Sequence, residues 1–366
     1  MTWTLLFFTS LALLFVLPLL PALLEWRLKR DALPLQVVRE HDGNIKHFAK
    51  RFHEFVVARF AQALDAAAAS PAPRAGRLDS GDAYQLVGAA GVPDLPSQEA
   101  SGQSLDVLVL GAADLRLGSG TLYEKEVYAR ADIRSGDGNS FRALLAGGEI
   151  VLGADCDVLR WAHSDSRLVA GARSRLFGRV SADRELVLHG DTRFGRMHAP
   201  TIRFGDTAPA GTVPAPVAPL QYTPLQRPDH LLDDAAGRWL LGGDWALPDH
   251  ARHAGSLVAR GSMTVGAQAW VEGSIKCHGD LVLQAGTRID GALVCSGDMT
   301  IGPGCVIGGP LVCEQKIMIE AGTVLGSLAV ETTATASEIR VREGVVVHGT
   351  VWARELGYVA PAGIVS

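Results

Sequence analysis

The most restrictive feature of this chain is a six-residue repeat between Gly255 and Gly349. Every sixth position from Val265 is aliphatic or cysteine, with no slip of register: Val265, Val271, Cys277, Leu283, Ile289, Cys295, Ile301, Ile307, Cys313, Ile319 and Leu325. A period of 18 is superimposed on it, in one series at Met263, Leu281, Met299 and Ile317 and in another at Leu257, Ile275, Leu293 and Leu311. Three six-residue units therefore form one larger unit.

An α-helix cannot bury this pattern, because six residues advance it by about 600° and scatter the apolar positions around its surface. Triplets such as 281–283 and 293–295 instead alternate with the period of two of a strand that buries one side. Each unit is then a short strand and a turn, and three units close one triangular coil. The sequence predicts an all-β parallel β-solenoid whose coils bury their apolar faces against one another.

A less regular repeat precedes this one. Its aliphatic positions are spaced by 16 to 18 residues, at Leu115, Ile133, Ile150, Leu168, Leu186 and Ile202. Bulky apolar residues follow the first five at a distance of eight, at Tyr123, Phe141, Val158, Leu176 and Phe194. We expect a degenerate solenoid half over 103–206 and a regular half over 239–356. The outward positions of the first half are rich in Arg and Asp, which indicates a solvated face.

Residues 207–238 separate the two repeats and are rich in proline. Because proline lacks an N–H group, this segment predicts an extended linker without regular strand pairing.

The N-terminus carries an uncharged run, Trp3–Leu24, of 22 residues. As a helix it would be about 33 Å long, enough to cross a bilayer, so we predict a transmembrane anchor within 1–30, kinked at its end by Pro18 and Pro21. Arg27, Lys29 and Arg30 follow the run, and this asymmetry predicts a single-pass protein of the inner (cytoplasmic) membrane with a cytoplasmic body. Five cysteines, an odd number, agree with a reducing compartment.

Residues 39–70 predict an amphipathic helix. Its apolar stripe consists of residues three or four apart: Ile45, Phe48, Phe52, Phe55, Val56 and Phe60. Three roles are open for this helix: lying on an anionic membrane surface, capping the open end of the solenoid, or pairing with another copy of itself.

A search for chemistry finds no phosphate-binding GxxxxGK, no GxSxG, no HExxH and no Cys–His metal spacing. His250 and His253 beside Asp249 are interpreted as surface residues, and Cys277, Cys295 and Cys313 as small apolar residues of one interior row. We therefore predict no enzyme activity, no catalytic, cofactor or metal site and no cofactor. A net charge of -5 gives no reason to expect nucleic acid.

The C-terminal half resembles a bactofilin, a bacterial polymer-forming cytoskeletal protein. The runs GSLVARGSMTVG, GSIKCHGDLVLQAG and GALVCSGDMTIGPG carry the resemblance, over roughly residues 240–352. It implies a right-handed triangular solenoid that assembles end to end without nucleotide, often at the inner face of the membrane. The alternative is a hexapeptide-repeat acyltransferase, whose left-handed coil would use a histidine such as His278 or His253 as a general base. On two of the three sides, large residues stand two positions before the aliphatic residue of the repeat and disfavour that alternative: Leu281, Met299, Ile317, Ile275, Leu293 and Leu311.

The last coil carries Val345, Val347, Val351 and Trp352, with no further coil after it in the sequence. A solenoid end exposes unpaired N–H and C=O groups, so either the tail over 358–365 folds over this coil or a second molecule stacks on it. Because Pro361 and Gly363 limit the ladder bonds of the tail, we expect these four residues to form a self-assembly interface. The predicted partners are the protein itself, the lipid bilayer and unidentified membrane or cell-envelope proteins. The predicted function is that of a membrane-anchored scaffold.

Overall fold

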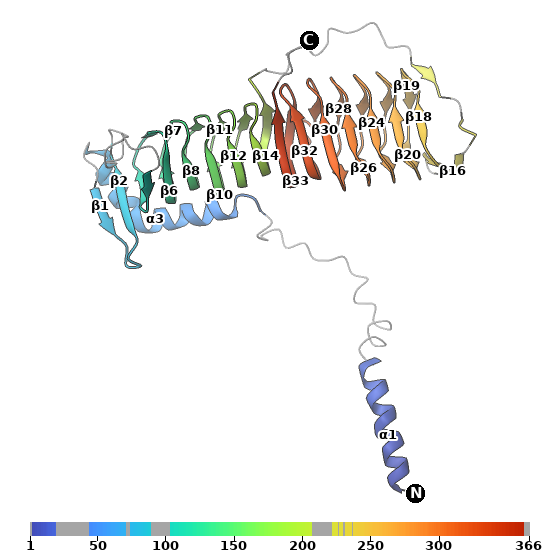
Figure 1. The fold of residues 1–366 in the computed structure, drawn as a ribbon, viewed down its shortest axis with the longest axis horizontal. Coiled ribbons are helices and arrows are strands. Elements are labelled where there is room, and N and C mark those ends of the chain that lie inside the picture. The colour runs from blue at the N-terminus through green and yellow to red at the C-terminus, as the bar shows by residue number, and fades with distance from the viewer. Residues whose placement is uncertain are drawn as a thin grey trace. The chain divides into compact units, whose positions relative to one another are not determined.

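The computed structural model describes residues 2–19, 44–70, 74–88, 103–206, 222–225, 227–229, 231–235 and 237–361. The chain divides into two units, Met1–Asn44 and Ile45–Ser366. The first contains α1 (Thr2–Val16) and a short 3-10 helix, η1 (Leu17–Leu19). The second contains α3 (His47–Ala68) and the strands of the solenoid (Figure 1).

The predicted transmembrane anchor is wrong. Helix α1 has 15 residues, about 22 Å at 1.5 Å per residue, whereas a bilayer core is about 30 Å thick. It ends before Leu17-Pro18, because a proline disfavours the α conformation of the residue before it. No helix among the described residues is long and apolar enough to cross a membrane. This finding contradicts the predicted single-pass inner-membrane protein with a cytoplasmic body, and Arg27, Lys29 and Arg30 lie outside the described residues.

The predicted parallel β-solenoid is confirmed. The strands of the first half are β1 (Arg74–Arg77), β2 (Ala83–Val87), β3 (Gln103–Leu105), β4 (Leu108–Gly111), β5 (Leu115–Leu117), β6 (Thr121–Ala129), β7 (Ile133–Ser135), β8 (Ser140–Ala146), β9 (Ile150–Leu152), β10 (Asp157–Ser164), β11 (Arg167–Ala170), β12 (Arg175–Ala182), β13 (Glu185–Leu188) and β14 (Arg193–Phe204). The spacing of the sequence sets their register. Leu115 lies beside Ile133, and Tyr123 beside Phe141, in adjacent coils.

The second half is more regular. Its strands are β15 (Thr223–Pro224), β16 (Leu231–Ala235), β17 (Arg238–Leu241), β18 (Trp245–Leu247), β19 (Ala251–His253), β20 (Ser256–Ala259), β21 (Met263–Val265), β22 (Trp270–Val271), β23 (Ile275–Cys277), β24 (Leu281–Leu283), β25 (Arg288–Ile289), β26 (Leu293–Cys295), β27 (Met299–Ile301), β28 (Val306–Ile307), β29 (Leu311–Cys313), β30 (Lys316–Ile319), β31 (Val324–Leu325), β32 (Thr332–Arg342) and β33 (Val346–Ala360). All eleven hexad positions are buried. The predicted absence of pairing in 207–238 is wrong in part, because β15 pairs with β19 and β16 with β17.

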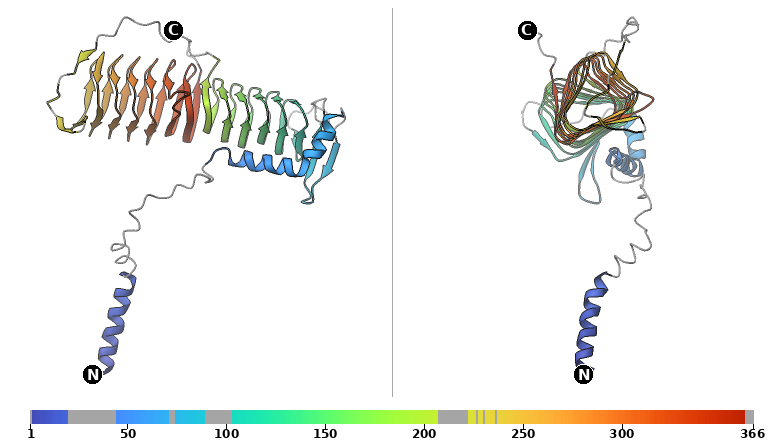
Figure 2. Two further views of the ribbon diagram at one scale, coloured as in Figure 1. Left: turned by 180° about the vertical axis from the view of Figure 1, so that it is seen from behind. Right: turned by 90° about the vertical axis from the view of Figure 1, so that its right-hand side faces the viewer.

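The two halves form one rod with three faces (Figure 2). Face A, defined by its strands, runs from β1 through β2, β4, β6, β8, β10, β12 and β14 to β33, and on through β32, β29, β26, β23, β20 and β17 to β16. Strands β14 and β33 pair antiparallel, whereas successive coils within each half pair parallel. The halves therefore advance along the rod in opposite directions and meet at their last coils.

Two solenoids that advance in opposite directions along one rod pair antiparallel where they meet only if both coils have the same handedness. A right-handed coil and a left-handed coil advancing toward each other would pair parallel instead. The two halves are thus solenoids of one hand. The right hand implied by the bactofilin resemblance stays a prediction.

Helix α3 does not cap the open end of the solenoid, which was one of the three roles left open by the sequence. Membrane binding and pairing with another copy stay predictions. The helix lies lengthwise against face A of the first half (Figure 1), where Val56, Phe60 and Leu64 are buried against outward residues of the coils. Those outward residues are apolar, unlike the usual solvated face of a solenoid: Leu86, Leu108, Leu110, Tyr128, Ala143, Leu145 and Trp161. The chain therefore covers only part of the apolar stripe of the helix, because Phe48 and Phe55 stay 47% and 36% exposed.

Candidate functional site

The predicted assembly residues lie in the junction between the halves. Val345, Val347 and Val351 are buried, and Trp352 keeps 42% of its surface exposed. Val351 pairs with Met197, and Val347 with Ile202, across the antiparallel contact of β33 and β14. The expectation that no further coil covers this set is wrong, because the first half supplies that coil.

A groove opens at one corner of this junction because the two strands turn the corner with unequal lengths. Phe194 pairs with Gly357, and Arg196 pairs with Trp352. Between these two pairs β14 has one residue, Gly195, whereas β33 has four, residues 353–356. The extra residues of β33 bow away from β14 and leave a cavity of about 700 Å³. The same corner needs a glycine at 357, since a Cβ there would lie 2.2 Å from the Phe194 ring.

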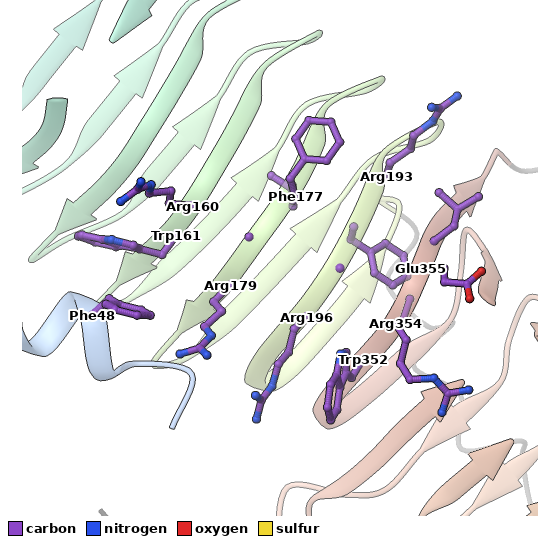
Figure 3. A pocket seen from close by; sticks show the side chains of 16 residues that line it. Phe48, Arg160, Trp161, Phe177, Arg179, Arg193, Arg196, Trp352, Arg354 and Glu355 are labelled. Carbon is purple, nitrogen blue, oxygen red and sulfur yellow. The ribbon is translucent and has the colours of Figure 1, made fainter. Parts of the chain in front are cut away.

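The groove is rich in arginine and aromatic side chains, and we call it the arginine–aromatic groove (Figure 3). Its charged residues, among those that the structure describes, are Arg160, Arg179, Arg193, Arg196, Arg354 and Glu355. Its aromatic residues are Phe48, Trp161, Phe177, Phe194 and Trp352. Among the described residues, five arginines and one glutamate thus line the groove.

A row of four side chains forms the floor of the groove. Trp161, Arg179, Arg196 and Trp352 lie side by side on β10, β12, β14 and β33 (Figure 3). The Arg179 guanidinium lies 5.0 Å from the centre of the Phe48 ring, and that of Arg196 lies 5.0 Å from the Trp352 ring. Burial, followed by the neighbouring positive charge of Arg179, lowers the pKa of Arg196. Two like charges are thus held one strand apart.

The N-terminal end of α3 borders the groove and is fastened to the rod by an ion pair. Lys46 Nζ lies 2.6 Å from Asp183 Oδ1, and His163 Nε2 lies 3.2 Å from Asp165 Oδ1. Ligand atoms of His163, Asp165 and Asp183 lie within 4.8 Å of one another, which is metal-ligand spacing. The Lys46 ammonium already neutralises Asp183, so the cluster is best explained as the attachment of α3.

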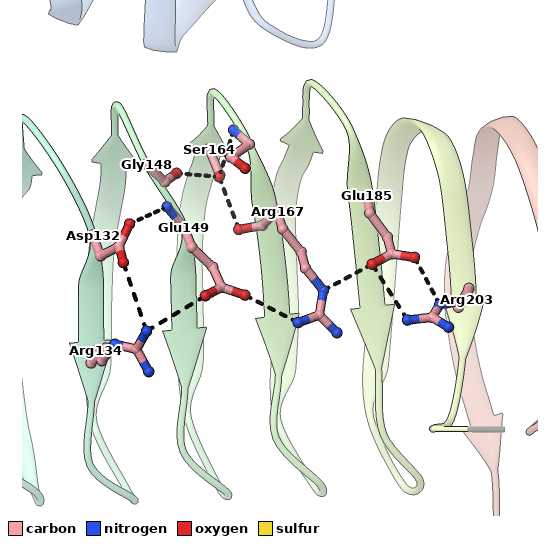
Figure 4. A network of polar contacts seen from close by, with 9 residues as sticks. Asp132, Arg134, Gly148, Glu149, Ser164, Arg167, Glu185 and Arg203 are labelled. Carbon is pink, nitrogen blue, oxygen red and sulfur yellow. Dashed lines mark hydrogen bonds and ion pairs between the residues drawn. The ribbon is translucent and has the colours of Figure 1, made fainter. Parts of the chain in front are cut away.

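Elsewhere on the first half, arginines alternate with carboxylates. Glu149 lies 3.1 Å from Arg167, and Glu185 lies 2.8 Å from both Arg167 and Arg203 (Figure 4). Such partly exposed pairs at the surface contribute little to stability, about 0–1 kcal/mol each. The arginines and carboxylates of these pairs neutralise one another.

The cysteine row has the predicted geometry. Cys277, Cys295 and Cys313 pair in successive coils and are buried. The hydrogen bond with Cys277, together with burial, raises the pKa of Cys295 to about 12. The Cys295 thiol is therefore protonated at neutral pH and unreactive.

The histidines considered as a possible site differ in their exposure to solvent. The interpretation of His253 as a surface residue is wrong, because His253 is only 8% exposed and packs against Trp239, with 4.7 Å between ring centroids. Its Nε2 has no hydrogen-bond partner among the described residues. His278, by contrast, is exposed.

Sequence reasoning missed the arginine–aromatic groove. Trp161, Arg179 and Arg196 are spaced by 18 and 17, so the coil period could have placed them in one outward row. Phe48 and Trp352 have no such relation to them, because α3 and β33 reach the groove through packing alone. No protein-family model, curated protein or solved structure matches this chain.

Proposed function

We propose that this chain is a non-enzymatic scaffold of the bactofilin type, a rod of stacked coils that assembles end to end. The observation that carries the proposal is the β14–β33 junction, in which two solenoid ends of this sequence dock strand to strand. The same kind of contact between molecules would lengthen the rod.

The free ends of the rod are the first coils of each half rather than the last. Among the described strands, β1 pairs only with β2 and β16 only with β17, and both lie at the ends of face A. Strand β1 carries Arg74 and Arg77, whereas β16 carries Asp233 and Asp234. Charges on edge strands oppose pairing with a like edge. Opposite charges therefore favour a contact of β1 with β16 of the next molecule, and a head-to-tail polymer.

Sedimentation velocity of the full chain at tens of micromolar tests this proposal. We expect the wild type to form oligomers, and the variants R74D/R77D and D233R/D234R each to remain monomeric. An equimolar mixture of the two variants should assemble again. R74D/R77D has two acidic ends and D233R/D234R has two basic ends, so each end of one variant can pair with an end of the other. Arg116→Asp, an exposed charge reversal on β5, serves as the matched control and should assemble like the wild type. A monomeric wild type, or equal assembly of every variant, would contradict the proposal.

A further inference from the structure

The first coil of the second half, formed by β17, β18 and β19, has a histidine at an interior position. Counted back from Val265 in steps of six, the buried series continues through Ala259, His253, Leu247 and Leu241. In this series, from 241 to 325, His253 is the one residue that can take up a proton near neutral pH. Every other position is aliphatic or cysteine, so the imidazole replaces a small apolar side chain in the core of the end coil.

All three faces of the end coil meet at this imidazole. His253 lies on β19, Trp239 on β17 and Trp245 on β18. The centroid of the Trp239 ring lies 4.7 Å from that of His253 and 6.4 Å from that of Trp245. Toward the next coil, His253 pairs in register with Val271. Because the imidazole is 8% exposed and packs against apolar side chains, a charge on it would lose its hydration.

The charged groups that face His253 do not offset this loss. Among the described residues they are the carboxylates of Asp234 on β16 and Glu272 after β22, whereas β17 and β18 contribute neutral tryptophans. Arg227 Nη2 lies 3.4 Å from Asp234 Oδ2, and Arg252 Nε donates to Glu272 Oε1 at 2.7 Å, so both carboxylates are already paired. Burial has the largest effect and lowers the pKa of His253, against the opposing effects of a backbone group of β20 and the two carboxylates. The folded end coil therefore favours the neutral imidazole.

Trp239 links this imidazole to the end strand of face A. It pairs in register with Asp234 across the antiparallel contact of β17 and β16. Leu231 of β16 packs against the same core that Trp239 borders. Loss of the packing between His253 and Trp239 would thus loosen the ladder that holds β16 on the rod.

We propose that His253 is a pH-sensitive switch at the β16 end of the rod: the neutral imidazole keeps the end coil closed, and the charged imidazole opens it and releases β16. The sign follows from burial. The imidazole binds a proton more readily in the open coil, where water hydrates the charge, so the closed coil is stable above about pH 6.5 and opens as the pH falls below it. The consequence for assembly, loss of the contact through β16 at mildly acidic pH, rests on the function proposed above.

Amide hydrogen exchange of the full chain at pH 7.5 and 5.5 tests the opening independently of assembly. Protection factors, which correct for the direct effect of pH on exchange, should fall in β17 and β19 by up to about tenfold for each pH unit below about 6.5. Those of β26, in the middle of the second half, should stay the same. His253→Leu restores an aliphatic residue to the series, and His253→Gln keeps a polar side chain that does not titrate. Both variants should lose the pH dependence in β17 and β19.

Sedimentation velocity at tens of micromolar, at the same two pH values, tests the consequence for assembly. We expect the wild type to form oligomers at pH 7.5 and monomers at pH 5.5, and His253→Leu to form oligomers at both. The matched control is His278→Gln, which removes an exposed imidazole outside the end coil and should respond to pH like the wild type.

The two measurements separate the possible failures. Protection that stays constant in the wild type, or that falls equally in His253→Leu and His253→Gln, would overturn the switch. Wild-type oligomers that persist at pH 5.5 although β17 and β19 have lost protection would overturn the release of β16. A wild type that is monomeric at both pH values would contradict end-to-end assembly, and the exchange data would then decide on the switch alone.

Discussion

Replacing Val351 by alanine tests whether the two halves form one cooperative rod. Val351 is 1% exposed and packs under Met197 of the other half. The change removes two methyl groups, which at about 0.8 kcal/mol each, plus a term for the cavity left behind, costs about 2 kcal/mol. The matched control is Val312→Ala on β29 of the same face. Val312 is 40% exposed, so its loss should cost less than about 0.5 kcal/mol.

Native-state amide hydrogen exchange measures the effect strand by strand. A loss of about 2 kcal/mol corresponds to exchange about 30-fold faster. Val351→Ala should accelerate exchange in β14 as well as in β33, although β14 belongs to the other repeat and precedes the linker. Acceleration in β33 with β14 unchanged would refute the junction, and an equal effect of Val312→Ala would refute the claim that burial at the junction causes it.

Three further predictions concern the rest of the rod. Val56→Asp should destabilise the docking of α3 by about 3 kcal/mol and expose the helix to protease, because Val56 is fully buried. The neighbouring Val57→Asp, at a site 51% exposed, should leave cleavage unchanged. Equal cleavage of the two variants would contradict the packing of α3 against face A. Burial lowers the pKa of His253 in the folded rod, so the stability associated with the neutral imidazole is fully present above about pH 6.5 and is lost as the pH falls below it. Urea unfolding at neutral and at mildly acidic pH should show a smaller acid loss in His253→Gln than in the wild type, and an identical loss would be inconsistent with this assignment. The raised pKa of Cys295, about 12, predicts that a thiol reagent labels it at neutral pH only after urea unfolding. Rapid labelling of Cys295 in the folded chain would contradict a buried, protonated thiol at this position.

The local register of both halves could be predicted from the sequence because a solenoid coil touches only its neighbours. Cys277, Cys295 and Cys313 are adjacent in space because they are 18 residues apart in the chain, which is the length of one coil. Even the degenerate half follows this rule, with Tyr123 stacked on Phe141 at 4.9 Å between ring centroids. Apolar length alone was a poor guide to α1, since the effect of Pro18 on the helix outweighed the hydropathy of the run.

The sequence by itself determined the coil, its period and the residues that fill it, because each of these depends on contacts between residues about 18 positions apart. The tertiary structure alone decided how the halves meet. No periodicity crosses the linker, so nothing in the repeat says that β33 returns to lie antiparallel on β14 and covers the coil that was expected to be exposed. The arginine–aromatic groove follows from that meeting, since its opening comes from two strands that turn one corner with unequal lengths. A periodic sequence specifies neighbours within a repeat, and only packing in three dimensions specifies what its ends touch.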